Sequence, residues 1–71
     1  MHDIPTQEPL AYRPEEAARL LSVGRHKIFD LIRAGELRSV RIGHSRRIPR
    51  TAVEEYIEQR LAAEQAAGGE A

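Results

Sequence analysis

The fold is decided by residues 24–50, which read GRHKIFDLIRAGELRSVRIGHSRRIPR. This basic segment contains eight of the eleven lysines and arginines of the chain but two of its eleven acids, so its formal charge is +6. The remainder of the chain carries −6, and the formal net charge of +0 conceals this division. A basic face between acidic flanks is the electrostatic pattern of a protein that binds a polyanion.

The first half of the basic segment predicts a helix over residues 25–34. Ile28, Leu31 and Ile32 recur at helical spacing and define the face that we expect to be buried. Gly35 follows, and glycine is the residue that most readily ends a helix in the left-handed conformation. This half therefore predicts a short helix with one apolar and one polar face.

The second half of the basic segment predicts a β-hairpin. Val40 and Ile42 alternate with Arg41, which is the pattern of a half-buried strand. Residues 43–45 are typical of a turn, and residues 46–48 of the returning strand. Because an isolated two-stranded hairpin is only marginally stable, we expect it to pack against the helices.

Another short helix is predicted before the basic segment. Pro14 suits the first position of a helix, where its missing N–H costs nothing. Ala17, Leu20 and Leu21 form an apolar stripe, and we expect the helix to end near Leu21. Residues 22–24 then connect it to the helix at 25–34, so the two form a helix-turn-helix.

A third helix is predicted after the hairpin. Thr51 and Glu54 have the spacing of a capping box, in which the two side chains satisfy backbone donors of the first turn. The apolar residues of this helix recur at helical spacing and are Val53, Tyr56, Ile57 and Leu61. Its opposite face is acidic and carries Glu54, Glu55 and Glu58. We expect this face to lie away from any DNA phosphate.

Seventy-one residues allow one small domain, and we expect an α+β fold, a small winged helix-turn-helix, over residues 12–62. Residues 1–11 are interpreted as a flexible N-terminal arm, and residues 63–71 as a helix extension with a disordered tail. No apolar run approaches the roughly 20 residues of a membrane span. The first residues also lack the basic and apolar regions of a signal peptide. We therefore expect a cytoplasmic protein with no membrane contact.

The residues that carry chemistry in enzymes are not arranged for catalysis. The chain has no cysteine, no Ser/His/Asp or Cys/His pattern and no phosphate-binding glycine loop. His2, His26 and His44 do not have the spacing of metal ligands. We therefore expect a protein that is not an enzyme, with no catalytic residue, metal or cofactor.

Several motifs resemble one known family. RPEEAARLLSV at residues 13–23, IFDLIRAGEL at 28–37, VRIG at 40–43 and RIPR at 47–50 are similar to the excisionase-type family of small winged helix-turn-helix proteins, which is related to the DNA-binding domains of MerR-like regulators. The resemblance covers about residues 12–61. It implies a bacterial or phage protein that binds double-stranded DNA. Some members direct a phage-type integrase toward excision, and others regulate transcription.

The sequence departs from the family pattern at four positions of the helix-turn-helix. Gly24 stands where Ser or Thr is usual, and glycine caps a helix only slightly less well. His26 and Lys27 replace small hydroxyl residues, and Asp30 stands where a basic residue is frequent. Because these changes affect the base preference, the family's DNA recognition sequence is not transferred to this chain.

The helix at 25–34 is the predicted recognition helix, with its N-terminal end in the major groove. Its candidate DNA-binding residues are Gly24, Arg25, His26, Lys27, Phe29, Asp30 and Arg33. Arg25 is suited to guanine, Lys27 to phosphate, and Asp30 to a cytosine amine. The alternative is a solvated face in which Asp30 pairs with Arg33 or His26. Phe29 is expected to be partly buried, with its edge toward DNA.

The hairpin is the predicted wing, with its tip at the minor groove. Its candidate DNA-binding residues are Arg41, His44, Ser45, Arg46 and Arg47. The alternative is a basic edge strand that only resists aggregation. Arg38 and Arg50 lie near the base of the wing and are expected to hold flanking phosphates, with a solvated role as their alternative.

The predicted function is that of an excisionase, a recombination directionality factor that binds and bends attachment-site DNA. The expected partners are double-stranded DNA, a phage-type integrase and further copies of the chain bound side by side. One alternative is a small transcription regulator with the same DNA contacts. A different alternative is a protein-interaction module whose basic face binds an acidic protein. A flat dependence of DNA affinity on salt would favour this last alternative.

Overall fold

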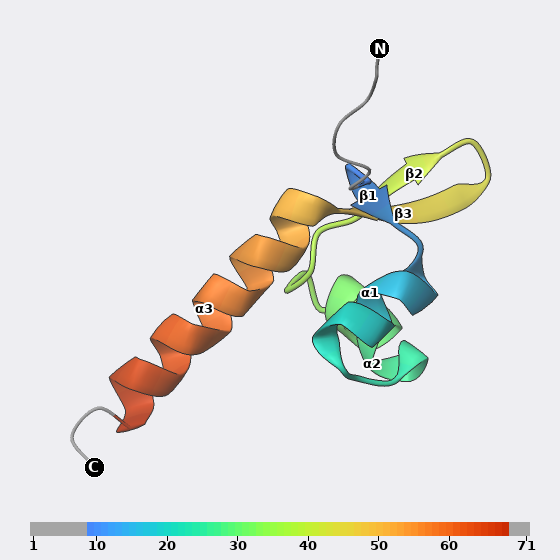
Figure 1. Ribbon diagram of the computed structural model, residues 1–71. Helices are drawn as coiled ribbons and strands as arrows, with labels where there is room; N and C mark the ends of the chain where they lie inside the picture. The colour runs from blue at the N-terminus through green and yellow to red at the C-terminus, as the bar shows by residue number, and fades with distance from the viewer. Residues whose placement is uncertain (1–8, 69–71) are drawn as a thin grey trace.

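The computed structural model describes residues 9–68 and contains three helices and a small antiparallel sheet (Figure 1). The elements in chain order are β1 (Ala11–Tyr12), α1 (Pro14–Leu21), α2 (Arg25–Arg33), β2 (Val40–Ile42), β3 (Ser45–Pro49) and α3 (Arg50–Gly68). This order confirms the predicted α+β fold, a helix-turn-helix followed by a hairpin and a third helix.

The turn between α1 and α2 is closed by backbone hydrogen bonds. Ser22 adopts the left-handed conformation at the end of α1 (φ 59°), and the Val23 N–H donates to the Ala18 carbonyl at 2.9 Å. Gly24 is the N-cap of α2 and has an extended backbone. At the other end of α2, Gly35 has the predicted left-handed conformation (φ 78°). The sequence therefore predicted both helices and their limits to within one residue.

The sheet has three strands in the order β1-β3-β2, not the two that the sequence predicted. β1 pairs with β3 through Ala11 opposite Pro49 and Tyr12 opposite Ile48. Ala11 therefore belongs to the domain and not to a flexible arm. Residues 1–8, which make up most of the predicted arm, lie outside the described residues. The strand was missed because two residues are too few to show an alternating pattern.

The hairpin is closed by a turn in which Gly43 has a positive φ (64°). Arg41 lies directly opposite Arg46, while Val40 faces Arg47 across the ladder. Because directly opposed residues share one face of a sheet, Arg41 and Arg46 lie on one face and Val40 on the other. Val40 and Ile42 are exposed, and the prediction that they are half-buried is wrong. The reason is that β2 is an edge strand whose main contacts are with β3.

The core lies where α1, α2, β3 and the start of α3 meet. Its buried side chains are Ala17, Ala18, Ile28, Leu31, Leu37, Ile48, Ala52 and Val53. Tyr12, Leu21, Ile32 and Tyr56 pack against them and are half-buried. Leu20 belongs to the predicted apolar stripe of α1 but is 57% exposed, because the buried side of this helix consists of Pro14, Ala17 and Ala18.

The third helix begins at Arg50, earlier than the sequence predicted. Thr51 is therefore inside the helix, and its assignment as the residue of a capping box is wrong. The first backbone N–H of the helix, that of Arg50, donates to the Leu10 carbonyl at 2.8 Å. The chain next to β1 thus supplies the partner that a capping side chain would otherwise provide.

Beyond its first two turns, α3 extends away from the rest of the domain, on the opposite side from the hairpin (Figure 1). Ile57 and Leu61, which belong to the predicted apolar stripe of this helix, are therefore 48% and 56% exposed and lie outside the core. Residues 66–68, predicted as tail, are helical, and residues 69–71 lie outside the described residues. Between residues 9 and 68, none of the helices combines the length and the apolar character that a membrane span requires.

Candidate nucleic-acid interface

The first turn of α2 concentrates basic side chains at the positive end of the helix dipole. Arg25, His26 and Lys27 follow one another there, and no acid accompanies them. Gly24 contributes no side-chain hydrogen bond to the exposed N–H groups of this turn. Acidic side chains stabilise this end of a helix and basic side chains destabilise it, so the arrangement lowers the stability of α2. It is, however, well suited to a phosphate or to the electronegative edge of a guanine.

Five of the predicted contact residues line one shallow depression along the exposed face of α2. They are Arg25, His26, Phe29, Asp30 and Arg33. Gly24 and Lys27 do not line it. The structure therefore brings together five of the seven recognition-helix residues that the sequence selected, and their contacts with DNA stay predictions.

Arg25 is oriented by an aromatic side chain on the next turn of α2. Its guanidinium carbon lies 5.1 Å from the centroid of the Phe29 ring. A cation–π contact of this kind contributes about 0.5–1 kcal/mol at an exposed site. Phe29 itself is half-buried, as expected, so its ring is a fixed support. We infer that Phe29 reduces the number of conformations that Arg25 must lose on binding.

Asp30 and Arg33 form an ion pair across one turn of α2. This is the alternative that the sequence left open for Asp30. Both side chains are more than half exposed, and exposed pairs of this kind contribute about 0–1 kcal/mol. A base or phosphate can therefore replace either partner at little cost, and the contacts of Asp30 and Arg33 with DNA stay predictions.

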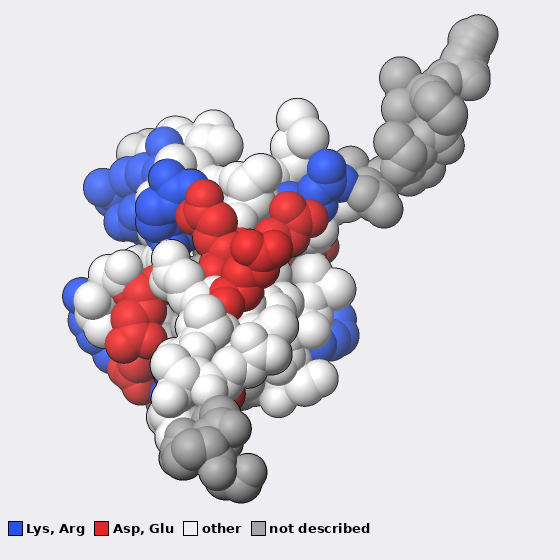
Figure 2. All heavy atoms as spheres, turned by 90° about the vertical axis from the view of Figure 1, so that its left-hand side faces the viewer, with Lys and Arg blue, Asp and Glu red and all other residues white. Residues whose placement is uncertain are grey.

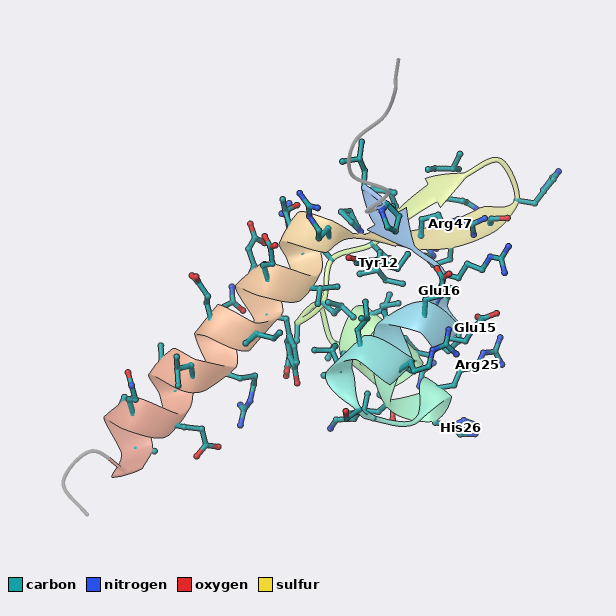
Figure 3. All side chains as sticks on the ribbon, in the orientation of Figure 1. Tyr12, Glu15, Glu16, Arg25, His26 and Arg47 are labelled. Carbon is teal, nitrogen blue, oxygen red and sulfur yellow. The ribbon has the colours of Figure 1, made fainter. Side chains whose placement is uncertain are left out.

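The wing carries its basic side chains next to the start of α2. Arg46 donates a hydrogen bond from Nη1 to Ser39 Oγ at 3.2 Å, and Arg47 donates one to the Arg46 carbonyl at 3.1 Å. His44 lies in the turn at the tip, and Ser45 begins β3. In Figure 3 the labelled side chains of Arg25 and His26 lie on the same side of the molecule as Arg47, away from α3.

An open groove separates the wing from the two helix N-termini. We call it the wing groove, and the charged or aromatic residues that line it are Arg13, Glu15, Arg25, Phe29, Arg46 and Arg47. Ser45 also lines it. Sequence reasoning missed Arg13 and Glu15, since both precede the basic segment. A signal was present at Arg13, which has no side-chain acceptor and is therefore a poor residue before a helix.

Arg38 and Arg50, predicted to hold flanking phosphates, lie next to acidic side chains of α3. Arg38 pairs with Glu55 at 2.9 Å, and Arg50 Nε lies 3.8 Å from Glu54 Oε2. Both are thus placed against the acids of α3 and not in the wing groove. Figure 2 shows acidic side chains gathered at the centre of the α3 side, with basic ones at its margins. A DNA contact of Arg38 or Arg50 would have to compete with these acids.

Within the described residues, no group of three or more His, Cys, Asp or Glu side chains is arranged to hold a metal ion.

A helix-turn-helix whose second helix begins with three basic side chains, next to a basic antiparallel hairpin, defines a winged helix-turn-helix DNA-binding protein. Residues 11–61 match the family described as "Helix-turn-helix domain". A "Probable excisionase" of Saccharopolyspora erythraea is 51% identical over 53 residues, which are 75% of this chain and 54% of that protein. An "Excisionase" of Streptomyces ambofaciens is 48% identical over 48 residues, or 68% of this chain and 76% of that protein.

The chain therefore belongs to the excisionase-type helix-turn-helix family, as the sequence motifs predicted. It spans about half the length of the first relative and about three quarters of the second. No solved structure gives a significant match. The family is one of DNA-binding proteins and not of enzymes, in agreement with the sequence.

The wing arginines give the first testable prediction. Arg46→Ala and Arg47→Ala should each weaken DNA binding about equally for all sequences, because a contact with phosphate carries no base information. Each change should also reduce the slope of log affinity against log salt by about one. Binding titrations at four salt concentrations measure both effects. Arg60→Ala is the control, since Arg60 pairs with Glu64 on the exposed part of α3. A loss confined to one DNA sequence would contradict a phosphate contact.

Proposed function

We propose that this protein is an excisionase, which binds attachment-site DNA and bends it so that a phage-type integrase recombines in the direction of excision. The observation that carries the proposal is the meeting of the basic first turn of α2 with the basic wing on one side of the molecule. The names of the two relatives, both excisionases, support the choice of excision among DNA-binding roles.

The proposed DNA contact is small and needs support from neighbours. A single module of this size buries roughly 600–1,000 Å² on DNA, which is little for specific binding by one copy. If about five phosphates are neutralised, the slope of log affinity against log salt is about −4 to −5. We propose that selectivity comes from several copies bound side by side, next to the integrase. The acids of α3 are a surface that a basic neighbour can contact.

We also propose that the DNA-binding unit consists of residues 11–62. β1 supplies its third strand, and the core ends within the first two turns of α3. The remainder of α3 is an extension of this unit. The proposed place of action is the bacterial cytoplasm, where the DNA lies.

An excision assay with purified components tests the proposed function. The components are this protein, a phage-type integrase and a plasmid that carries both attachment-site junctions of that integrase. Excision should require the wild-type protein, and a variant with Arg25→Ala and Arg47→Ala should fail although it stays folded. A gel-shift series in which the binding site is moved along a fragment should reveal a bend.

The assay also separates the alternatives. Footprinting that protects a promoter but not an attachment site would favour a transcription regulator. If the affinity for duplex DNA hardly changes with salt concentration, the contact is not with the phosphate backbone. That result would contradict the proposed role on DNA and favour an acidic protein as the partner.

A further inference from the structure

Arg13 lies in the wing groove because of the short strand β1. Tyr12 pairs with Ile48 of β3, and Arg13 follows Tyr12 directly. The pairing therefore holds Arg13 beside the strand that carries Arg46 and Arg47. Arg13 is more than thirty residues away from Arg46 and Arg47 in the sequence, so the fold, and not the local sequence, brings them together.

The position of Arg13 is unfavourable for the helix that follows it. Arg13 is the N-cap of α1, and its guanidinium offers no acceptor to the first N–H groups of the helix. Its positive charge also lies at the positive end of the helix dipole. Its backbone N–H, in contrast, donates to Glu16 Oε1 at 2.9 Å, so the backbone is fixed. Arg13 thus lowers the stability of α1 while its side chain lines a groove. Ligand binding accounts for an arginine at this position better than a contribution to folding does.

Arg13 is an exposed residue. Among residues 9–68, no ion pair or side-chain hydrogen bond is formed by its guanidinium. Arg33 and Arg38, in contrast, pair with Asp30 and Glu55. An anion can therefore reach Arg13 without displacing a partner.

We propose that the wing groove binds one phosphodiester strand of the DNA and that Arg13 is a phosphate-binding residue. The inference rests on the proposed DNA-binding function. If α2 enters the major groove and the wing contacts the adjacent minor groove, one sugar-phosphate backbone of the DNA separates the two grooves. That backbone must then pass between α2 and the wing. Arginine suits this strand because its planar group makes paired hydrogen bonds to phosphate oxygens. The N-cap residue of α1, the first residue of α2 and the strand β3 each place at least one arginine there.

Glu15 places a negative charge among the arginines of the wing groove. It lines the same groove and is exposed, in the first turn of α1. Its charge stabilises the helix at this end, but it repels a phosphate strand in the groove. Glu15 therefore lowers the affinity for every DNA sequence to a similar extent, whereas Arg13 raises it.

Two neighbouring substitutions with opposite expected effects test this assignment. Arg13→Gln should weaken binding to a fluorescent duplex by about threefold to tenfold and reduce the salt slope by about one. Glu15→Gln should tighten binding by about twofold to fivefold and steepen the salt dependence. Neither change should alter which base-substituted duplexes are preferred. Thermal unfolding followed by circular dichroism should show that Arg13→Gln does not destabilise the protein, since the arginine works against its helix.

Arg19→Gln is the matched control, because Arg19 is exposed in the last turn of the same helix and does not line the groove. The proposal is overturned if Arg13→Gln binds DNA as Arg19→Gln does while Arg46→Ala still weakens binding. If Arg46→Ala and Arg25→Ala are also without effect, the proposed DNA-binding face itself is wrong.

Discussion

Ile28→Ala should lower the free energy of unfolding by about 2–5 kcal/mol, so that the protein unfolds at a much lower urea concentration than the wild type. Ile28 is 0% exposed and lies at the centre of the core, next to the alanines of α1. Replacing a buried isoleucine by alanine costs about 2–5 kcal/mol, because methyl groups are lost and a cavity remains. A domain of this size has a free energy of unfolding of roughly 3–9 kcal/mol. The single change therefore removes about half or more of the stability.

Urea denaturation followed by circular dichroism measures the effect. Ile57→Ala is the matched control, since the same residue type lies on α3 with 48% of its surface exposed. That change should alter the free energy of unfolding by less than about 1 kcal/mol. The pair also separates the buried part of the predicted apolar stripes from their exposed part, since each isoleucine belongs to one such stripe. Equal losses in the two variants would show that α3 packs along its length, contrary to the structure.

The sequence predicted the elements better than it predicted which of their faces are buried. Pro14 and Gly35 mark helix ends through their own backbone preferences, so these limits can be derived locally. An apolar stripe shows which face a helix would bury, but not how far its neighbour extends. Ile57 and Leu61 continue the stripe of Val53 past the point at which the body of the domain ends. Only the assembled fold contains that information.

The same distinction applies to the candidate interface. Arg25 and Arg47 were found because charge is concentrated in one segment, and the fold places both on the wing groove. Arg38 belongs to that segment but lies against Glu55. Arg13 lies outside it and enters the groove through the β1–β3 pairing. Local charge therefore predicted the kind of ligand, and long-range strand pairing decided which arginines share the site.

Arg25→Ala is expected to have the largest effect on DNA recognition. Arg25 is the first residue of α2, lines both the depression on α2 and the wing groove, and is supported by the Phe29 ring. An arginine that makes paired hydrogen bonds to guanine contributes about 1–3 kcal/mol of discrimination against other bases. The variant should therefore bind its preferred site about 10-fold to 100-fold more weakly and should no longer distinguish it from a site with the guanine replaced.

Competition binding with a series of single-base variants of the site measures this loss. Arg25→Lys keeps the charge without the planar group, so it should recover part of the affinity but little of the discrimination. Phe29→Leu removes the cation–π contact and should produce a smaller loss of the same kind. Lys27→Gln should weaken binding to all sites alike, because Lys27 lies outside the depression on α2. If Arg25→Ala weakens binding but leaves the order of preferred bases unchanged, Arg25 contacts phosphate, and the reading of bases must be assigned to another part of α2.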